Sequence, residues 1–382
     1  MMSLRKITLF MGVLIFPALL VVTACSAQTD SLPNIIPRKG LPVNIIAKKN
    51  HLLVLPVIAR SIETSWSFGT AVSGTFHINK KDSTARTSNL QSLVLYSLKK
   101  QFIAAVNGTI YFPGEKFILS TQLSYSFFPD KFWGTGRIAP DSNAESYNFK
   151  QFYIYLHGQR SVANHLYVGV IYEYQRLFKV NYIPGGLFDK ENIPGRTSYH
   201  ISGLGASFTY DTRNDAFAPD KGVFLQGYFN HFAPLFGSDF KYTNYVVDVR
   251  SFIKTYKKQV LALQAYAFLN SGMVPLRSLA SFGGANSMRG YYDGRYRDKD
   301  QVVLQAEYRV PVYKRFGAVL FGGVGNVGHA SDYLTVNELK YSYGGGIRVA
   351  LTKSEKLNLR LDYGIARGFK SKGLYFQLGE AF

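Results

Sequence analysis

Apolar and polar residues alternate with a period of two through most of the chain, whereas a period of 3.6 is hard to find. In KLNLRLDYGIA, Leu357 and the alternate positions up to Ile365 share one face. The positions between them, from Asn358 to Ala366, share the other face. One face is apolar and the opposite face is small or polar, as expected for half-buried strands. The pattern predicts an all-β protein.

Sixteen segments show this pattern. The expected strands span residues 52–60, 65–78, 88–99, 101–112, 116–127, 149–158, 164–176, 200–211, 222–232, 241–255, 258–270, 300–311, 315–325, 340–352, 356–367 and 373–382. A soluble sandwich alternates in the same way. The aromatic residues in HLYVGVIYEYQ and YSYGGGIRVAL favour a transmembrane barrel, whose outer face is apolar and rich in Tyr and Phe near the interfaces.

The lengths of the connections support the barrel. The longest irregular stretches all follow odd-numbered strands, and they include 128–148, 177–199, 233–240, 271–299 and 326–339. Outer-membrane barrels have an even number of strands, short periplasmic turns and long outer loops. We therefore expect a 16-stranded antiparallel transmembrane β-barrel over residues 52–382, integral to a bacterial outer membrane.

The N-terminal segment predicts export. Residues 1–27 have a basic start, an apolar run and then small residues, which is the layout of a signal peptide. Cleavage after Ala27 would discard Cys25, whereas the VTAC sequence also resembles a lipoprotein box that would leave Cys25 lipidated. Residues 28–51 contain three prolines and have no room for a packed core, so we expect a short periplasmic segment.

Charge and composition narrow the function classes. The chain has 44 Lys+Arg against 24 Asp+Glu, a net charge of +20, but the basic residues are spread over turns and form no single stripe. This distribution favours outer-membrane lipid and lipopolysaccharide as partners over nucleic acid. One cysteine excludes a disulfide framework within the chain and a cysteine metal site.

No pattern of residues predicts catalysis. The seven histidines lack metal-ligand spacing, and no serine stands in a Gly-x-Ser-x-Gly elbow. The GGANSMRG segment has too few of the glycine spacings of a nucleotide-binding loop. We expect no enzyme activity, no metal and no cofactor.

Three groups of segments resemble one family. YDTRNDAFAPDKGVFLQGYF is similar to its Asp-x-Arg turn motif, FGGANSMRGYYDG to its signature on the sixth extracellular loop, and LQAEYRVP, LFGGVGNVG, GGGIRVAL and LRLDYGIA to the end of its barrel. The chain thus resembles the BamA/TamA-like outer-membrane assembly and translocator superfamily over about residues 52–382. The resemblance implies a subgroup that lacks the N-terminal polypeptide-transport-associated domains.

The resemblance also implies a lock inside the barrel. In the family, the signature loop folds into the lumen and its arginine pairs with acidic residues on the inner wall. Here Arg289, followed by Gly290 and Tyr291, would be that arginine, and alternation places Glu307 and Asp362 on inner faces. The chain departs from the family pattern in FGGVG, where Gly323 stands in place of an expected acid.

The sequence also predicts a periplasmic turn and a weak lateral seam. The motif residues Asp211, Arg213, Asp215 and Gly222 are expected to form a periplasmic turn. Pro56, Phe376 and Phe382 are expected at a weak lateral seam between the first and last strands, since proline removes a ladder hydrogen bond. In a last strand continued to Phe382, Glu380 would share the lipid-side face with Phe376 and Phe382.

By resemblance, the chain would assist insertion or transport of polypeptide or lipid at the outer membrane. A client outer-membrane protein, or a separate periplasmic subunit that supplies the missing domains, would be its partner. The alternative is a passive pore plugged by residues 271–299, or a purely structural barrel.

Overall fold

The computed structural model describes residues 51–79, 88–215, 218–330, 335, 338–350, 358–367 and 371–382. The predicted signal peptide, 1–27, and residues 28–50 of the predicted periplasmic segment lie outside the described residues. So does the predicted start of the penultimate strand, at 356–357.

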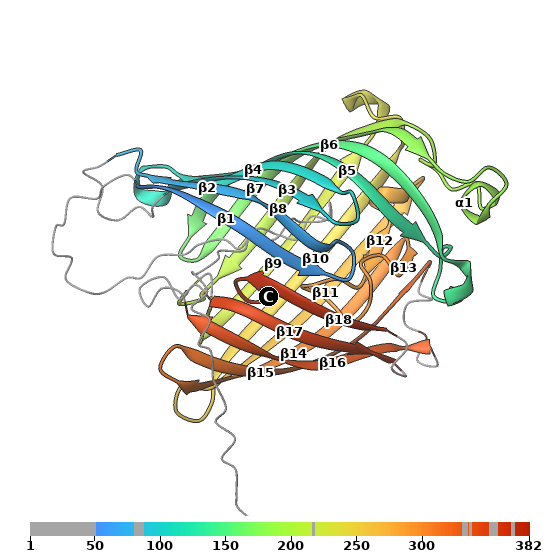
Figure 1. Ribbon diagram of the computed structural model, residues 1–382. Coiled ribbons are helices and arrows are strands. Elements are labelled where there is room, and N and C mark those ends of the chain that lie inside the picture. The colour runs from blue at the N-terminus through green and yellow to red at the C-terminus, as the bar shows by residue number, and fades with distance from the viewer. Residues whose placement is uncertain are drawn as a thin grey trace, which may run out of the picture.

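Strands of one barrel make up most of the molecule (Figure 1). The wall consists of β1 (His51–Ser61), β2 (Ser65–Phe76), β3 (Ser88–Ser97), β4 (Phe102–Tyr111), β5 (Phe117–Phe132), β6 (Glu145–Ala163), β7 (Leu166–Asn181), β8 (Tyr199–Asp211), β9 (Gly222–Phe232), β10 (Tyr242–Lys254), β11 (Val260–Gly272), β14 (Asp300–Tyr313), β15 (Phe316–Gly328), β16 (Lys340–Ala350), β17 (Asn358–Ala366) and β18 (Lys372–Leu378).

Each strand pairs antiparallel with its neighbours, and β18 returns to β1 to close the barrel. Within the described residues the wall contains sixteen strands, which confirms the predicted fold class. A separate two-stranded sheet, β12 (Ala280–Phe282) with β13 (Tyr296–Asp298), lies in the connection between β11 and β14. The short helices are η1 (Pro113–Glu115), η2 (Asp141–Asn143), α1 (Leu187–Lys190), η3 (Pro234–Phe236) and η4 (Leu276–Ser278).

The two faces of the wall carry different side chains. On β17, Leu361 and Tyr363 are 39% and 45% exposed, whereas Arg360 and Asp362 are 1% and 0% exposed. The same alternation places apolar side chains on the outer face of the closed barrel and small or polar ones on the inner face. Among the described residues, no helix is long and apolar enough to cross a bilayer.

Three strands are longer than predicted by three residues or more. β5, β6 and β7 contain 16, 19 and 16 residues. The loop predicted at 128–148 is therefore reduced to residues 133–144, because the β5–β6 ladder continues to Phe132 opposite Glu145. Stacking of Phe128 on Phe149, with ring centroids 6.2 Å apart, supports this extension. The barrel wall therefore extends past the residues at which the loops were predicted to begin.

The prediction for the last strand is wrong at its end. β18 stops at Leu378, and Gly379 adopts φ 83°, a left-handed conformation that breaks the alternation. Glu380 therefore turns to the inner face, where its Oε2 lies 2.7 Å from Arg348 Nε and its side chain is 3% exposed. Its predicted place on the lipid side is corrected accordingly.

Among the described residues, β1 and β18 have the shortest ladder of any two neighbouring strands in the barrel. Between the described residues of these strands, the ladder has a single register pair, Arg60 with Phe376. By contrast, β1 and β2 are paired along the whole length of β1, from His51 to Ser61. The barrel is closed, but β18 holds β1 with few backbone hydrogen bonds.

Candidate functional site: a buried arginine cluster

The connection between β11 and β14 brings Arg289 against the inner wall. Its Nη1 donates to Asp362 Oδ2 of β17 at 2.5 Å, and its Nη2 donates to Glu307 Oε2 of β14 at 2.8 Å. The side chain is 1% exposed, and both carboxylates are fully buried. The guanidinium also lies over the Phe321 ring, 3.5 Å from its centroid. The residues that the sequence nominated for this contact are thus brought together.

Three more arginines surround the same carboxylates. Arg348 Nη1 lies 2.5 Å from Asp362 Oδ1, Arg309 Nε lies 2.8 Å from Glu307 Oε1, and Arg360 Nη1 lies 3.4 Å from Asp362 Oδ2. Arg348 also binds Glu380, as described above. We call this group the Arg289 cluster, and it consists of Arg289, Glu307, Arg309, Arg348, Arg360, Asp362 and Glu380. Four cations face three carboxylates, so the charges are nearly balanced, as a buried ionic network requires.

Glycines allow the loop backbone to approach the wall. Gly290 has φ 113°, and a Cβ on Gly364 of β17 would lie 2.5 Å from the carbonyl carbon of Arg289. Neither position therefore accepts a side chain without moving the backbone. Gly290 N donates to the Tyr375 hydroxyl at 2.9 Å, and that hydroxyl lies 3.2 Å from the carbonyl oxygen of Tyr291. The loop is thereby joined to β18 as well as to β17.

Gly323 has a different role from the expected acid. Met288, which precedes the arginine, is fully buried with Phe282 and Tyr291. A Cβ on Gly323 would lie 2.9 Å from Met288 Sδ. The glycine therefore provides the space that Met288 occupies. An apolar contact stands where the family pattern has a carboxylate, while Asp362 and Glu307 bind the arginine.

Asp130 is a second anchor of the same loop, and no sequence pattern indicated it. Its Oδ2 lies 3.0 Å from Arg277 Nη1 and 3.3 Å from Arg297 Nη2, and its Oδ1 accepts from the Tyr292 hydroxyl at 3.1 Å. Asp130 was expected in a loop, but it lies on β5 and is 6% exposed. These contacts join positions that are up to 167 residues apart, which local periodicity does not detect.

The loop also contacts the first hairpin. Asp293 N donates to Glu63 Oε1 at 2.9 Å, and Glu63 lies in the turn between β1 and β2. Burial raises the pKa of Glu63 to about 7, and the neighbouring carboxylate of Asp293 acts in the same direction. Lys99 Nζ donates to the carbonyl of Ile62 in the same turn. Residue 293 is therefore held next to β1, one of the two strands of the seam.

The predicted turn motif forms a compact buried pair. Arg213 donates from Nε and Nη2 to the two carboxylate oxygens of Asp211 at 2.9 and 2.7 Å, and both residues are at most 3% exposed. Asp215 Oδ1 accepts from Ala218 N at 3.1 Å. Gly222 opens β9 with φ 110°, and a Cβ there would lie 2.5 Å from the Thr212 carbonyl oxygen. These contacts, all between described residues, are those of the predicted connection between β8 and β9.

The three predicted seam residues do not all lie at the seam. Pro56 lies in β1 opposite Thr70 of β2, and Phe376 is the partner of Arg60 across the seam. Phe382 does not lie at the seam: it packs with Phe252 of β10 and with residues of β11. Strands β14 to β17 stand between these elements and β18 in the barrel order. The left-handed Gly379 redirects the last residues, so the prediction for Phe382 is wrong.

The described part of the chain was compared with the arrangements that metal binding and catalysis need. Within the described residues, no group of three or more His, Cys, Asp or Glu is placed to hold a metal ion. His157 Nε2 and Ser207 Oγ lie 2.7 Å apart on the inner wall, a contact that the sequence did not reveal. No hydrogen bond between described residues joins a carboxylate to His157, which a catalytic triad would need.

Comparison with known proteins agrees with this geometry. The model of the Omp85 superfamily domain matches residues 105–382. No curated protein sequence matches the chain. Among solved structures, the fold is similar to BamA from Haemophilus ducreyi lacking POTRA domains 1–3, with a TM-score of 0.58 and 13% identity over 87% of this chain and 70% of that one.

Two CdiB structures are similar to the same extent. CdiB from Escherichia coli gives a TM-score of 0.59 at 10% identity, over 86% of this chain and 62% of that one. CdiB from Acinetobacter baumannii gives 0.56 at 11% identity, over 86% and 59%. The chain thus spans about three fifths of the length of either CdiB. At these identities the likeness shows the fold, whereas the family match covers most of the sequence. The chain belongs to the Omp85 superfamily and is an integral β-barrel protein of the outer membrane.

Proposed function

We propose that this barrel assists the insertion or transport of polypeptide or lipid at the outer membrane, and that residues 273–299 fold into its lumen as a lock. The observation that carries the proposal is the burial of Arg289 between Glu307 of β14 and Asp362 of β17. Both acids lie on the inner-face positions of their strands. In this proposal, the loop fixes the positions of β14 and β17 relative to each other and so restrains the wall beside β18.

In this proposal, the β1–β18 seam is the part of the barrel that opens. β18 is held to β1 by one register pair, while Gly290 and Tyr291 of the loop bind the Tyr375 hydroxyl of β18. Asp293 of the same loop binds the β1–β2 turn through Glu63. One loop therefore contacts both sides of the junction with the fewest backbone hydrogen bonds. Release of the loop would then change how firmly β1 and β18 are held together.

Depletion of the protein tests the proposed activity. We expect its loss to reduce a subset of outer-membrane proteins or to change the distribution of lipid between leaflets. Re-expression of the wild type should restore the pattern, whereas Arg289→Ala should restore it only in part. An unchanged inventory of proteins and lipids after full depletion would contradict the proposal.

A separate periplasmic subunit remains part of the proposal. The matched structures are longer than this chain, and the matched BamA structure is one that lacks POTRA domains 1–3. A subunit that supplies equivalent domains would dock at the end of the barrel with short turns. Co-purification in mild detergent, with the deletion of residues 28–50 as the matched control, tests this point. Failure to recover any stoichiometric partner would favour a chain that acts alone.

A plugged passive pore is the second candidate, and the terminal segment favours it. Glu380 binds Arg348, and Phe382 packs with Phe252 on the inner wall. These contacts support a plug that has a second segment in addition to the proposed lock. Bilayer conductance of the wild type and of a variant without residues 273–299 separates the candidates. A large rise in conductance supports a plug, and transport needs the depletion experiment as well.

A further inference from the structure

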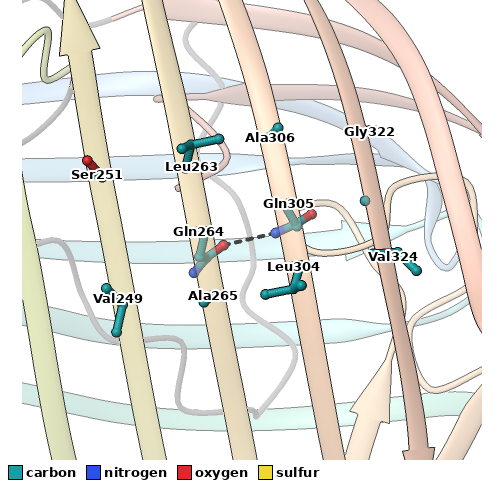
Figure 2. A pocket seen from close by; sticks show the side chains of 11 residues that line it. Val249, Ser251, Leu263, Gln264, Ala265, Leu304, Gln305, Ala306, Gly322 and Val324 are labelled. Atoms are coloured by element: carbon teal, nitrogen blue, oxygen red, sulfur yellow. Dashed lines mark hydrogen bonds between the residues drawn. The ribbon is translucent and has the colours of Figure 1, made fainter. Parts of the chain in front are cut away.

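A groove lies on the outer face of the wall, across β10, β11, β14 and β15 (Figure 2). It has a volume of about 490 Å³. Small outward-facing side chains make its floor, and the larger side chains of Leu263 and Leu304 stand beside them. The small residues are Ser251, Ala265, Ala306 and Gly322. Register places them side by side, because Leu263 is opposite Ala306, which in turn is opposite Gly322.

The wall is closed behind the groove. Gln305 Nε2 donates to Gln264 Oε1 at 2.9 Å, and these two side chains point to the inner face (Figure 2). Gln305 also accepts from Met288 N at 3.0 Å, so the loop lies directly behind this part of the wall. The groove therefore opens only toward the surroundings of the barrel, which in the outer membrane are lipid chains. Its lining is almost entirely apolar, as an acyl chain requires.

Basic and aromatic residues line the rim below the groove. The β10–β11 turn carries Lys257 and Lys258, and the β14–β15 turn carries Lys314 and Arg315. Lys257 Nζ lies 4.9 Å from the ring centroid of Tyr256, and Lys314 Nζ lies 4.9 Å from that of Tyr313. Neither turn contains an acidic residue. This arrangement is complementary to an anionic headgroup at the membrane interface.

The distance between the rim and the groove along the membrane normal matches the hydrocarbon thickness of one leaflet. From Phe316 to Gly322, β15 advances six residues, which is roughly 20 Å at about 3.4 Å per residue. A strand tilt of roughly 40° reduces this to about 15 Å along the membrane normal. Half of a hydrocarbon core of about 30 Å is also about 15 Å. A headgroup at the rim therefore places the end of its acyl chain at the groove.

The side of the membrane decides which lipid is concerned. The turns at 255–259 and 314–315 are short, and short turns mark the periplasmic end of outer-membrane barrels. The periplasmic leaflet presents phospholipids to this rim. We propose that the groove and its basic rim form a binding site for an anionic phospholipid of the periplasmic leaflet, with one acyl chain between Leu263 and Leu304. This site stands independently of the proposed function.

Native mass spectrometry of the full chain tests the site. The protein is reconstituted into vesicles of phosphatidylcholine with phosphatidylglycerol as the minority lipid, extracted in mild detergent, and its retained lipids are identified. Ala306→Phe fills the groove, and Ala206→Phe is the matched control, because Ala206 is an exposed outer-face residue of β8. The triple variant Lys257→Gln, Lys258→Gln and Lys314→Gln removes three positive charges from the rim and leaves Arg315, and the corresponding Lys→Arg triple retains all of them.

We expect the wild type, Ala206→Phe and the Lys→Arg triple to retain phosphatidylglycerol in preference to phosphatidylcholine. Ala306→Phe should lose the retained lipid, and the Lys→Gln triple should lose the preference between headgroups. If Ala306→Phe does not give a heat-modifiable folded barrel, Ala306→Leu replaces it. Equal phosphatidylglycerol retention by the folded groove variant and the control would overturn the proposal. A Lys→Gln triple with an unchanged headgroup preference, or a copy of the chain retained in place of lipid, would do the same.

Discussion

The Arg289 cluster makes a quantitative prediction about its own charge balance. Its four arginines face three carboxylates, so it carries one excess positive charge. Removal of Arg289 leaves three charges of each sign, and Asp362 keeps Arg348 and Arg360 as partners. Removal of Asp362 instead leaves four guanidinium groups beside two carboxylates. Asp362→Ala should therefore destabilise the barrel more than Arg289→Ala.

The magnitudes follow from the burial. Removal of one partner from a buried ion pair costs about 3 to 5 kcal/mol. We expect Arg289→Ala near the lower figure and Asp362→Ala near the upper one. The double variant removes a complete pair, so its cost should stay close to that of Asp362→Ala alone. The expected coupling is about 3 kcal/mol, the upper end of what is measured for residues in one network.

Urea unfolding of the purified barrel, followed by heat-modifiability, measures these free energies. Protease resistance of residues 273–299 measures in parallel whether the loop is released. Arg250→Ala is the control, because it breaks a 2.5 Å pair with Asp248 on the inner face of β10. That variant should lose stability without exposing the loop. Additive single effects, within about 0.5 kcal/mol, would refute the pairing, and so would a larger cost for Arg289→Ala than for Asp362→Ala.

Three further predictions concern the contacts around the cluster. Gly364→Ala should release the loop to protease, because its Cβ would overlap the backbone of Arg289, whereas Gly74→Ala, with no neighbour nearer than 3.8 Å, should not. The folded-state pKa of Glu63 is raised from 4.5 to about 7, so its contribution to stability is full below about 4.5 and is lost as the pH rises through about 7. Loop protection should therefore weaken over that range in the wild type and not in Glu63→Gln. Phe382→Ala should lower the unfolding free energy by about 3 kcal/mol, as for a buried aromatic residue. It should leave disulfide cross-linking between β1 and β18 unchanged. A change in that cross-linking would show that Phe382 does contribute to the seam.

Period-two alternation was sufficient for the strand number, and together with the family resemblance it indicated the partners of Arg289. The side-chain period of a strand fixes the face of every residue once one face is known, so Glu307 and Asp362 could be placed on the inner wall without coordinates. The same rule failed for Glu380. There Gly379 changes the backbone from extended to left-handed, and Glu380 and Phe382 leave the lipid-side face on which alternation placed them. Glycine permits such a change, and alternation alone does not signal it.

Contacts between distant segments were beyond the reach of the sequence pattern. Asp130 falls in the loop predicted at 128–148, yet the β5–β6 ladder continues there with Pro129 opposite Asn148. The aromatic packing of β5 on β6 extends both strands and thereby carries Asp130 to the arginines of the loop. Gly323 shows the same dependence on tertiary structure, since only the fold reveals that Met288 fills the space beside it.

In the proposed function, the β1–β18 seam moves when the protein inserts or transports its substrate. Arg60 and Phe376 face each other across the seam, and Cα atoms of such antiparallel pairs lie about 4.5 to 5.5 Å apart, within the range of a disulfide. The double variant Arg60→Cys and Phe376→Cys closes the seam, and Phe229→Cys with Tyr245→Cys closes the β9–β10 pair as a control. In depleted cells, we predict that the oxidised seam variant fails to restore the outer-membrane inventory, that reduction rescues it, and that the control restores it throughout. Full activity of the oxidised seam variant would contradict the account.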